Sequence, residues 1–100
     1  MARYIYLYKG PQVEMSPDFG AAWGAWMQKV GSALLDEGAP FGQGTNISDD
    51  HVESAALGLT GFTIMEATDM NHAKSLMDGH PWLAGSDGTF SFDIFELIAM

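Results

Sequence analysis

Apolar side chains recur with two different periods along this chain, and the periods predict alternating strands and helices. Residues 2–8 (ARYIYLY) alternate strictly, with three tyrosines on one side of the backbone and Ile5 and Leu7 on the other. Aromatic and β-branched residues at a period of two are typical of a β-strand. Because both sides of this segment are largely apolar, we expect both of its faces to be covered.

The next segment has a helical period. Ser16, Pro17 and Asp18 are typical of a helix start, with a capping side chain, a proline in the first turn and an acid near the positive end of the dipole. Apolar residues then recur at helical spacing as one broad stripe. Its members are Phe19, Ala22, Trp23, Trp26, Met27, Val30 and Leu34. Gly38, with Pro40 soon after, predicts the helix end.

The middle of the chain is less regular. Residues 41–47 (FGQGTNI) predict a weak strand that glycines interrupt, of the kind found at a sheet edge or a bulge. Residues 48–55 predict a polar loop or the tip of a hairpin. Residues 56–66 (ALGLTGFTIME) predict a second strand that is apolar on both faces.

The last part of the chain predicts a helix, a loop and a strand. Asp69 is placed to cap a short helix over residues 70–78, and the glycine and proline that follow end it. After a loop, residues 89–98 (TFSFDIFELI) alternate again and predict the final strand.

The predicted order β-α-β-β-α-β defines one α+β domain over residues 1–100. It is the ferredoxin-like arrangement, a four-stranded antiparallel sheet with two helices on one face. Two helices cover only one face, although the strands carry large apolar groups on both. We therefore expect the open face to pack on a second copy of the chain as a homodimer.

Composition narrows the classes of function. The 13 acidic and 4 basic residues give a net charge of −9, which argues against binding nucleic acid or an anionic membrane. The absence of cysteine excludes disulfides and Cys-ligated metals and favours a reducing, cytoplasmic compartment. No apolar run is long enough to span a membrane, and the N-terminal residues lack the pattern of a signal peptide.

Few motifs point to a cofactor. The glycines do not form a phosphate-binding loop or a dinucleotide fingerprint, and no Gly-x-Ser-x-Gly elbow occurs. Asp49, Asp50, His51 and Glu53 are possible metal ligands, but their spacing matches no known ion loop, and a solvated loop is the favoured interpretation. We expect neither a metal nor a cofactor.

The tyrosines of the first strand have two interpretations. Tyr4, Tyr6 and Tyr8 place a hydroxyl group at each tip, which suits a half-hydrated cavity or an interface. Tyr6 and Tyr8 are candidate ligand-binding residues for a small molecule. The alternative, favoured for Tyr4 and less firmly for Tyr6, is that they are aromatic residues of the dimer interface.

His80 also has two interpretations. It follows the second predicted helix, where the helix dipole favours its charged form, and an orienting carboxylate would make it a general acid or base. Alternatively, its side chain only caps the last carbonyls of that helix. Trp82 is a candidate ligand-binding residue that would line a cavity beside His80.

Short motifs along nearly the whole chain resemble those of the YCII-related proteins. They are a Trp-x-x-Trp-Met helix (Trp23, Trp26, Met27), an Asp-Glu-Gly turn (36–38), Thr-Gly-Phe-Thr-Ile (60–64), Gly-His-Pro (79–81) and a final Phe-Glu-Leu strand (95–97). The resemblance implies ferredoxin-like subunits that pair sheet to sheet around a central cavity, as a dimeric α+β barrel.

The resemblance also implies a site made of a histidine and a nearby aspartate. The Gly-His-Pro motif assigns the histidine to His80, and Asp36 is the candidate aspartate. The chain lacks the Asp-Gly-Pro-Phe run of one large branch of that family and has Asp-Asp-His-Val-Glu at residues 49–53 where the run would lie. Chemistry that depends on the run is therefore not implied here.

Three hypotheses follow. The first is a cofactor-independent dimeric enzyme that uses His80 and Asp36 for a lyase-like or isomerase-like proton transfer on a small aromatic or cyclic substrate. The second is a non-catalytic dimeric module that binds a small molecule in the same cavity. A more remote third is a cofactor-free monooxygenase. A His80 ring that opens into a cavity beside a carboxylate would favour catalysis, whereas a ring with both nitrogens bonded to helix carbonyls or water would favour the second hypothesis.

Overall fold

The computed structural model describes residues 1–99, which form six strands, two α-helices and two short 3-10 turns. The six strands are β1 (Ala2–Lys9), β2 (Leu34–Pro40), β3 (Thr45–Ile47), β4 (Glu53–Ala55), β5 (Leu59–Ala67) and β6 (Ser91–Leu97). The helices are α1 (Pro17–Val30) and α2 (Met70–Ser75), with two short 3-10 turns, η1 (Gly31–Ala33) and η2 (Pro81–Leu83).

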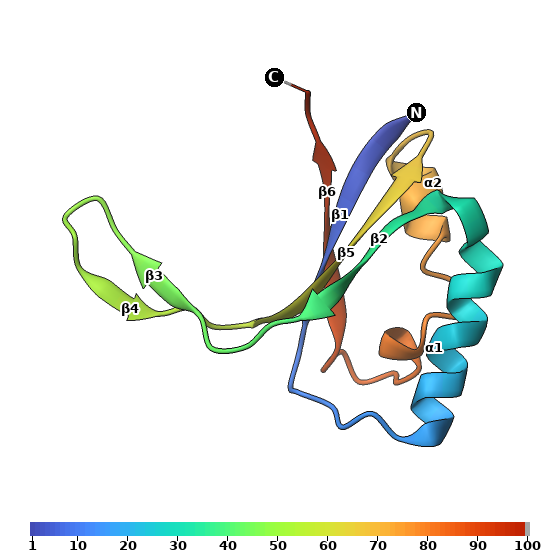
Figure 1. The fold of residues 1–100 in the computed structure, drawn as a ribbon, viewed down its shortest axis with the longest axis horizontal. Helices are drawn as coiled ribbons and strands as arrows, with labels where there is room; N and C mark the ends of the chain where they lie inside the picture. The colour runs from blue at the N-terminus through green and yellow to red at the C-terminus, as the bar shows by residue number, and fades with distance from the viewer. Residues whose placement is uncertain (100) are drawn as a thin grey trace.

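Four of the strands form one antiparallel sheet in the order β2-β5-β1-β6. Both α-helices lie on the same side of this sheet (Figure 1). The prediction of an α+β chain with a four-stranded antiparallel sheet and two helices is confirmed, and the arrangement is compatible with a ferredoxin-like fold. β3 and β4 pair only with each other, in a hairpin that stands apart from the sheet.

The predicted end of the first helix, at Gly38, is wrong. The helix ends at Val30, because Gly31 adopts a left-handed φ of 57° and its N–H donates to the carbonyl of Met27. The second strand of the sheet is β2, not the predicted strand at 41–47. Gly38 lies inside β2, where its φ is 74° and a Cβ atom would come within 1.7 Å of the Phe62 carbonyl oxygen.

The register of the sheet decides which side chains meet the helices. Tyr4, Tyr6 and Tyr8 all face the helices and are 4% exposed or less. The opposite face, called the open face here, carries the alternate residues. They are Arg3, Ile5, Leu7, Phe62, Ile64, Glu66, Asp93, Phe95 and Leu97. The interpretation of Tyr4 as an interface residue of the open face is therefore wrong, because Tyr4 is part of the core.

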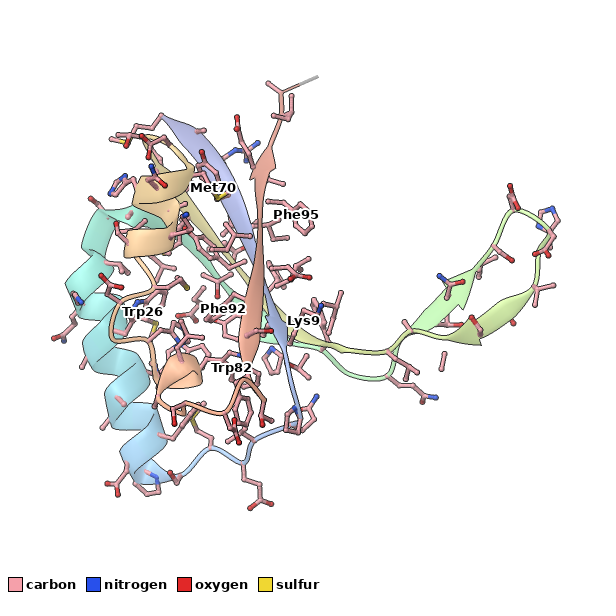
Figure 2. The ribbon with its side chains drawn as sticks, turned by 180° about the vertical axis from the view of Figure 1, so that it is seen from behind. Lys9, Trp26, Met70, Trp82, Phe92 and Phe95 are labelled. Atoms are coloured by element: carbon pink, nitrogen blue, oxygen red, sulfur yellow. The ribbon has the colours of Figure 1, made fainter. Side chains whose placement is uncertain are left out.

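Figure 2 shows this alternation in β6. Phe92 points to the side of the helices and Phe95 to the other side. Phe92 packs on Tyr8 with ring centres 4.5 Å apart, whereas Phe95 is 55% exposed. The surplus of apolar residues expected from the sequence therefore lies on the open face.

Three side chains tie the end of α2 to the rest of the core. Tyr6 Oη donates to the carbonyl of Ala73 at 2.9 Å, Trp26 Nε1 to that of Leu76 at 2.8 Å, and Lys29 Nζ to that of Asp78 at 2.9 Å. Carbonyls at the end of a helix have no partner within it. These bonds satisfy them and fix the segment that leads to His80.

Candidate functional site

His80 lies in the turn between α2 and η2. Gly79, with a φ of 80°, reverses the chain, and the backbone N–H of His80 donates to the carbonyl of Met77 at 3.0 Å. The imidazole then points inward and is only 2% exposed. Its ring centre lies 4.3 Å from that of Trp26, and two further aromatic rings, from Trp23 and Phe92, lie within 5.0 Å.

Both ring nitrogens of His80 have partners within the protein. Nδ1 lies 3.0 Å from the backbone nitrogen of Trp82, and Nε2 lies 3.2 Å from Tyr8 Oη. A backbone N–H can only donate, so Nδ1 carries no proton and the neutral ring holds its proton on Nε2. Burial among aromatic rings lowers the pKa of His80 from 6.5 to about 4. The imidazole is therefore neutral at pH 7.

The His80 side chain does not cap the last carbonyls of α2, so that interpretation is wrong. The bond to the α2 end comes from the backbone of His80, while the side chain caps the first turn of η2. That position resembles a helix N-cap, where an acceptor satisfies an otherwise unpartnered N–H.

A directed chain of hydrogen bonds continues from the His80 ring. Tyr8 Oη lies 2.8 Å from Thr63 Oγ1, which donates to the carbonyl of Glu37 at 3.1 Å. Since that carbonyl can only accept, Thr63 must accept from Tyr8, and Tyr8 accepts from His80 Nε2. Burial raises the pKa of Tyr8 to about 12. The site thus holds three neutral groups with every proton assigned.

Asp36 does not reach this chain. It is exposed and pairs with Ile64, which belongs to the open face, whereas His80 lies on the helix side. Its carboxylate accepts from the backbone N–H of Gly38 at 2.8 Å. The prediction that Asp36 orients His80 is therefore not borne out by the geometry, because the sheet separates the two side chains.

A pocket of about 300 Å³ lies next to Tyr8, between α1, β2 and the segment that joins β1 to α1. Four aromatic residues of the helix side line it, Tyr8, Phe19, Trp23 and Trp82, together with Phe62 of β5, and its polar lining residues are Gln12, Glu37 and Thr60. Among residues 1–99, no Lys, Arg or His lines it. The structure therefore brings two predicted ligand-binding residues, Tyr8 and Trp82, to one pocket, with His80 behind Tyr8.

Trp82 is held rigidly in the pocket wall. Its indole Nε1 lies between two carbonyls, 3.2 Å from that of Lys9 and 3.1 Å from that of Ser91, and so links the ends of β1 and β6. Tyr6 is not part of the wall. It is fully buried and its hydroxyl donates to Ala73, so the prediction of Tyr6 as a ligand-binding residue is wrong.

Sequence reasoning missed several members of the site. Thr63 belongs to a segment whose sequence predicts only an apolar strand, and Trp23 belongs to the apolar stripe of α1, whose spacing predicts a core residue. Trp23 is partly exposed, stacks on Tyr8 with ring centres 5.5 Å apart and lines the pocket. The three-residue spacing of Trp23 and Trp26 could have signalled that one side chain of the pair lies at the edge of the helix stripe.

Residues 49–52 of the acidic segment lie in the turn of the β3–β4 hairpin, and Glu53 begins β4. Asp50 accepts hydrogen bonds from the hydroxyl of Ser48 and the backbone N–H of Val52, and these lower the pKa of its carboxyl. Among residues 1–99, no group of three or more Asp, Glu or His side chains is placed to hold a metal ion. The same residues contain no helix that is long and apolar enough to cross a membrane.

Comparison of the chain with protein-family models and with curated proteins gives no match. The similarity to the YCII-related proteins therefore remains a prediction from short motifs.

Proposed function

We propose that this protein is a binding module for a small, neutral, aromatic molecule, held in the pocket beside Tyr8. The observation that carries the proposal is the state of His80. Its ring is buried, both of its nitrogens are bonded to protein groups, and its pKa is lowered to about 4. A general acid or base needs a pKa near the working pH and access to the reacting proton. His80 has neither, so it serves to position Tyr8 and Trp82.

The pocket favours one class of ligand. A volume of about 300 Å³ is at the lower end of ligand sites, which suits one or two fused rings. Aromatic side chains dominate the walls, and flat ligands stack on such rings. Of the described residues, Glu37 is the one charged residue in the lining, and the chain carries a net charge of −9, so an anionic ligand is disfavoured.

The open face supports the proposal of a homodimer. Its central row consists of Ile64, Ile5 and Phe95, three apolar residues side by side across three strands. A monomeric protein seldom leaves such a patch in water, and a two-fold axis lets the same patch cover itself. This dimer is also what the similarity to the YCII-related proteins implies. The lack of cysteine is compatible with a reducing, cytoplasmic setting.

A catalytic function would have to act through Tyr8 rather than His80. The observation that favours this second candidate is the directed chain of hydrogen bonds, because His80 Nε2 donates to the phenol oxygen of Tyr8, a residue that lines the pocket. With a pKa of about 12, Tyr8 stays neutral, and its one hydroxyl proton is donated to Thr63, so it could donate to a substrate oxygen only by giving up that bond. Binding needs no such rearrangement, so it is the simpler function.

Titration calorimetry with indole and with indole-3-acetate tests the proposal. We expect indole to bind, and the anionic analogue to bind at least about tenfold more weakly. Phe19→Ala removes an aromatic lining residue on α1 and should weaken binding at least about tenfold, whereas Phe95→Ala removes a phenylalanine of the open face, outside the pocket, and should not. Equal binding to the two variants, or tighter binding of the anion, would contradict the proposed site or its ligand class.

A further inference from the structure

The β3–β4 hairpin and its connections, residues 42–58, project from the body of the molecule as an arm (Figure 1). Every residue of the arm is exposed. The arm also makes the molecule extended: the radius of gyration is 14.8 Å, against about 13 Å for a compact domain of this length. The arm is therefore a surface feature that the body of its own chain does not cover.

An arm of this kind is not expected to be stable alone. A two-stranded hairpin without a packed face is marginal in water. This one also exposes large apolar side chains, with Ile47 61% exposed, Val52 59% and Leu57 85%. Because burial of such side chains is the main gain from forming structure, a second surface that covers them would account for the arm.

The direction of the arm identifies that second surface. The arm leaves the sheet at the ends of β2 and β5 and extends on the side opposite the helices. Figure 2 shows Phe95 of the open face pointing to the same side. A molecule that packs on the open face therefore lies alongside the arm.

We propose that the arm clasps a second copy of this chain in a dimer formed through the open face. The proposal rests on the homodimer proposed above. Under two-fold symmetry each copy gives one arm and receives one, so the contact is made twice. Ile47 and Val52 are then covered by the partner rather than by their own body.

The exposed area supports a partner of this size. The chain exposes 6818 Å², whereas a compact monomer of 10.8 kDa exposes about 5500 Å². The excess of about 1300 Å² is larger than the roughly 800 Å² that each partner buries in an interface of standard size. The open face and the arm together therefore provide the surface of a stable dimer.

Sedimentation equilibrium of an arm-shortened variant tests the clasp. An Asn-Gly turn would replace residues 43–57 and join β2 directly to β5. The two strands already meet there, since the N–H of Phe41 donates to the carbonyl of Thr60 at 2.8 Å. We expect the variant to fold and its dimer dissociation constant to rise at least about tenfold.

A full-length variant controls for any effect on the dimer that comes from shortening the chain rather than from losing the apolar side chains of the arm. Ile47→Ser with Val52→Ser keeps the arm but makes it polar, and it should weaken the dimer in the same direction. Met70→Ser with Leu83→Ser is the matched control, because these apolar side chains are 39% and 42% exposed outside the arm and the open face. The control should leave the dissociation constant unchanged.

The outcomes separate the arm from the other proposals. A dimer whose dissociation constant changes in neither arm variant would overturn the clasp but leave the open-face dimer standing. A wild-type chain that is monomeric at high micromolar concentration would overturn both. Indole binding reports on the pocket independently, so it distinguishes failure of the dimer from failure of the proposed ligand site.

Discussion

Replacement of His80 by asparagine should remove one specific source of pH-dependent stability. The buried ring is neutral in the folded chain, with a pKa of about 4, and has its ordinary value of 6.5 when the chain unfolds. An asparagine oxygen can still accept from the N–H of Trp82 at the start of η2, because asparagine is a good N-cap. The variant therefore keeps the turn but loses the titrating group.

The size of the effect follows from the two pKa values. A folded pKa that is depressed means that the unfolded chain binds more protons, so stability is fully present above pH 6.5 and is lost as the pH falls toward 4. A difference of about 2.5 pKa units corresponds to about 3 kcal/mol, of which about 2 kcal/mol is lost by about pH 5. The groups packed against the ring are Tyr8, Trp23, Trp26 and Phe92, and none of them titrates in this range.

Urea unfolding of the wild type and of His80→Asn at about pH 7.5 and about pH 5 measures this difference. At the higher pH the variant should be less stable by about 2 kcal/mol, because the buried ring and its contacts are lost. At the lower pH the difference in the free energy of unfolding should disappear, because only the wild type has a buried histidine whose neutral form stabilises the folded chain and is lost on protonation. A gap that stays constant with pH would refute the assignment of a sealed, neutral imidazole.

Further predictions concern backbone conformation and the open face. Gly24→Ala should raise the free energy of unfolding by about 0.5–1 kcal/mol in thermal melts, because Gly24 is inside α1 with open space where a Cβ would lie. Gly38→Ala should lower it by more than about 2 kcal/mol, through the clash with the Phe62 carbonyl at a φ of 74°; a neutral effect would mean that β2 follows another path. Phe95→Asp should yield monomers in sedimentation, while Leu83→Asp, at an apolar residue of similar exposure away from the open face, should not; a dimeric Phe95→Asp variant would place the interface elsewhere.

Local signals predicted the ends of elements well wherever a side chain does the capping. Ser16 Oγ accepts from the N–H of Phe19 at 3.1 Å, and Asp69 Oδ1 accepts from that of His72 at 2.8 Å, as the sequence indicated. The end of α1 was missed, because Leu34 continues the helical spacing beyond Gly31. β2 lies at the sheet edge and is mostly exposed, so its sequence shows no alternation that would have marked a strand.

The candidate site was predicted in part for a related reason. The prediction that Trp82 lies beside His80 is correct, because the two residues share a turn. Tyr8, at the end of its strand, contacts both of them. A strand that is apolar on both faces does not reveal which face the helices cover. Tyr6 could therefore not be assigned to the core, nor Asp36 to the opposite side of the sheet from His80.

The indole N–H signals of the three tryptophans test the central claim, that the pocket beside Tyr8 binds a neutral aromatic molecule. Trp23 and Trp82 line the pocket, whereas Trp26 is buried in the core and bonded to Leu76. In ¹H–¹⁵N spectra of the labelled protein, added indole should shift the signals of Trp23 and Trp82 in a saturable way and leave that of Trp26 in place. Unchanged spectra, or a shift of Trp26 alone, would contradict the account.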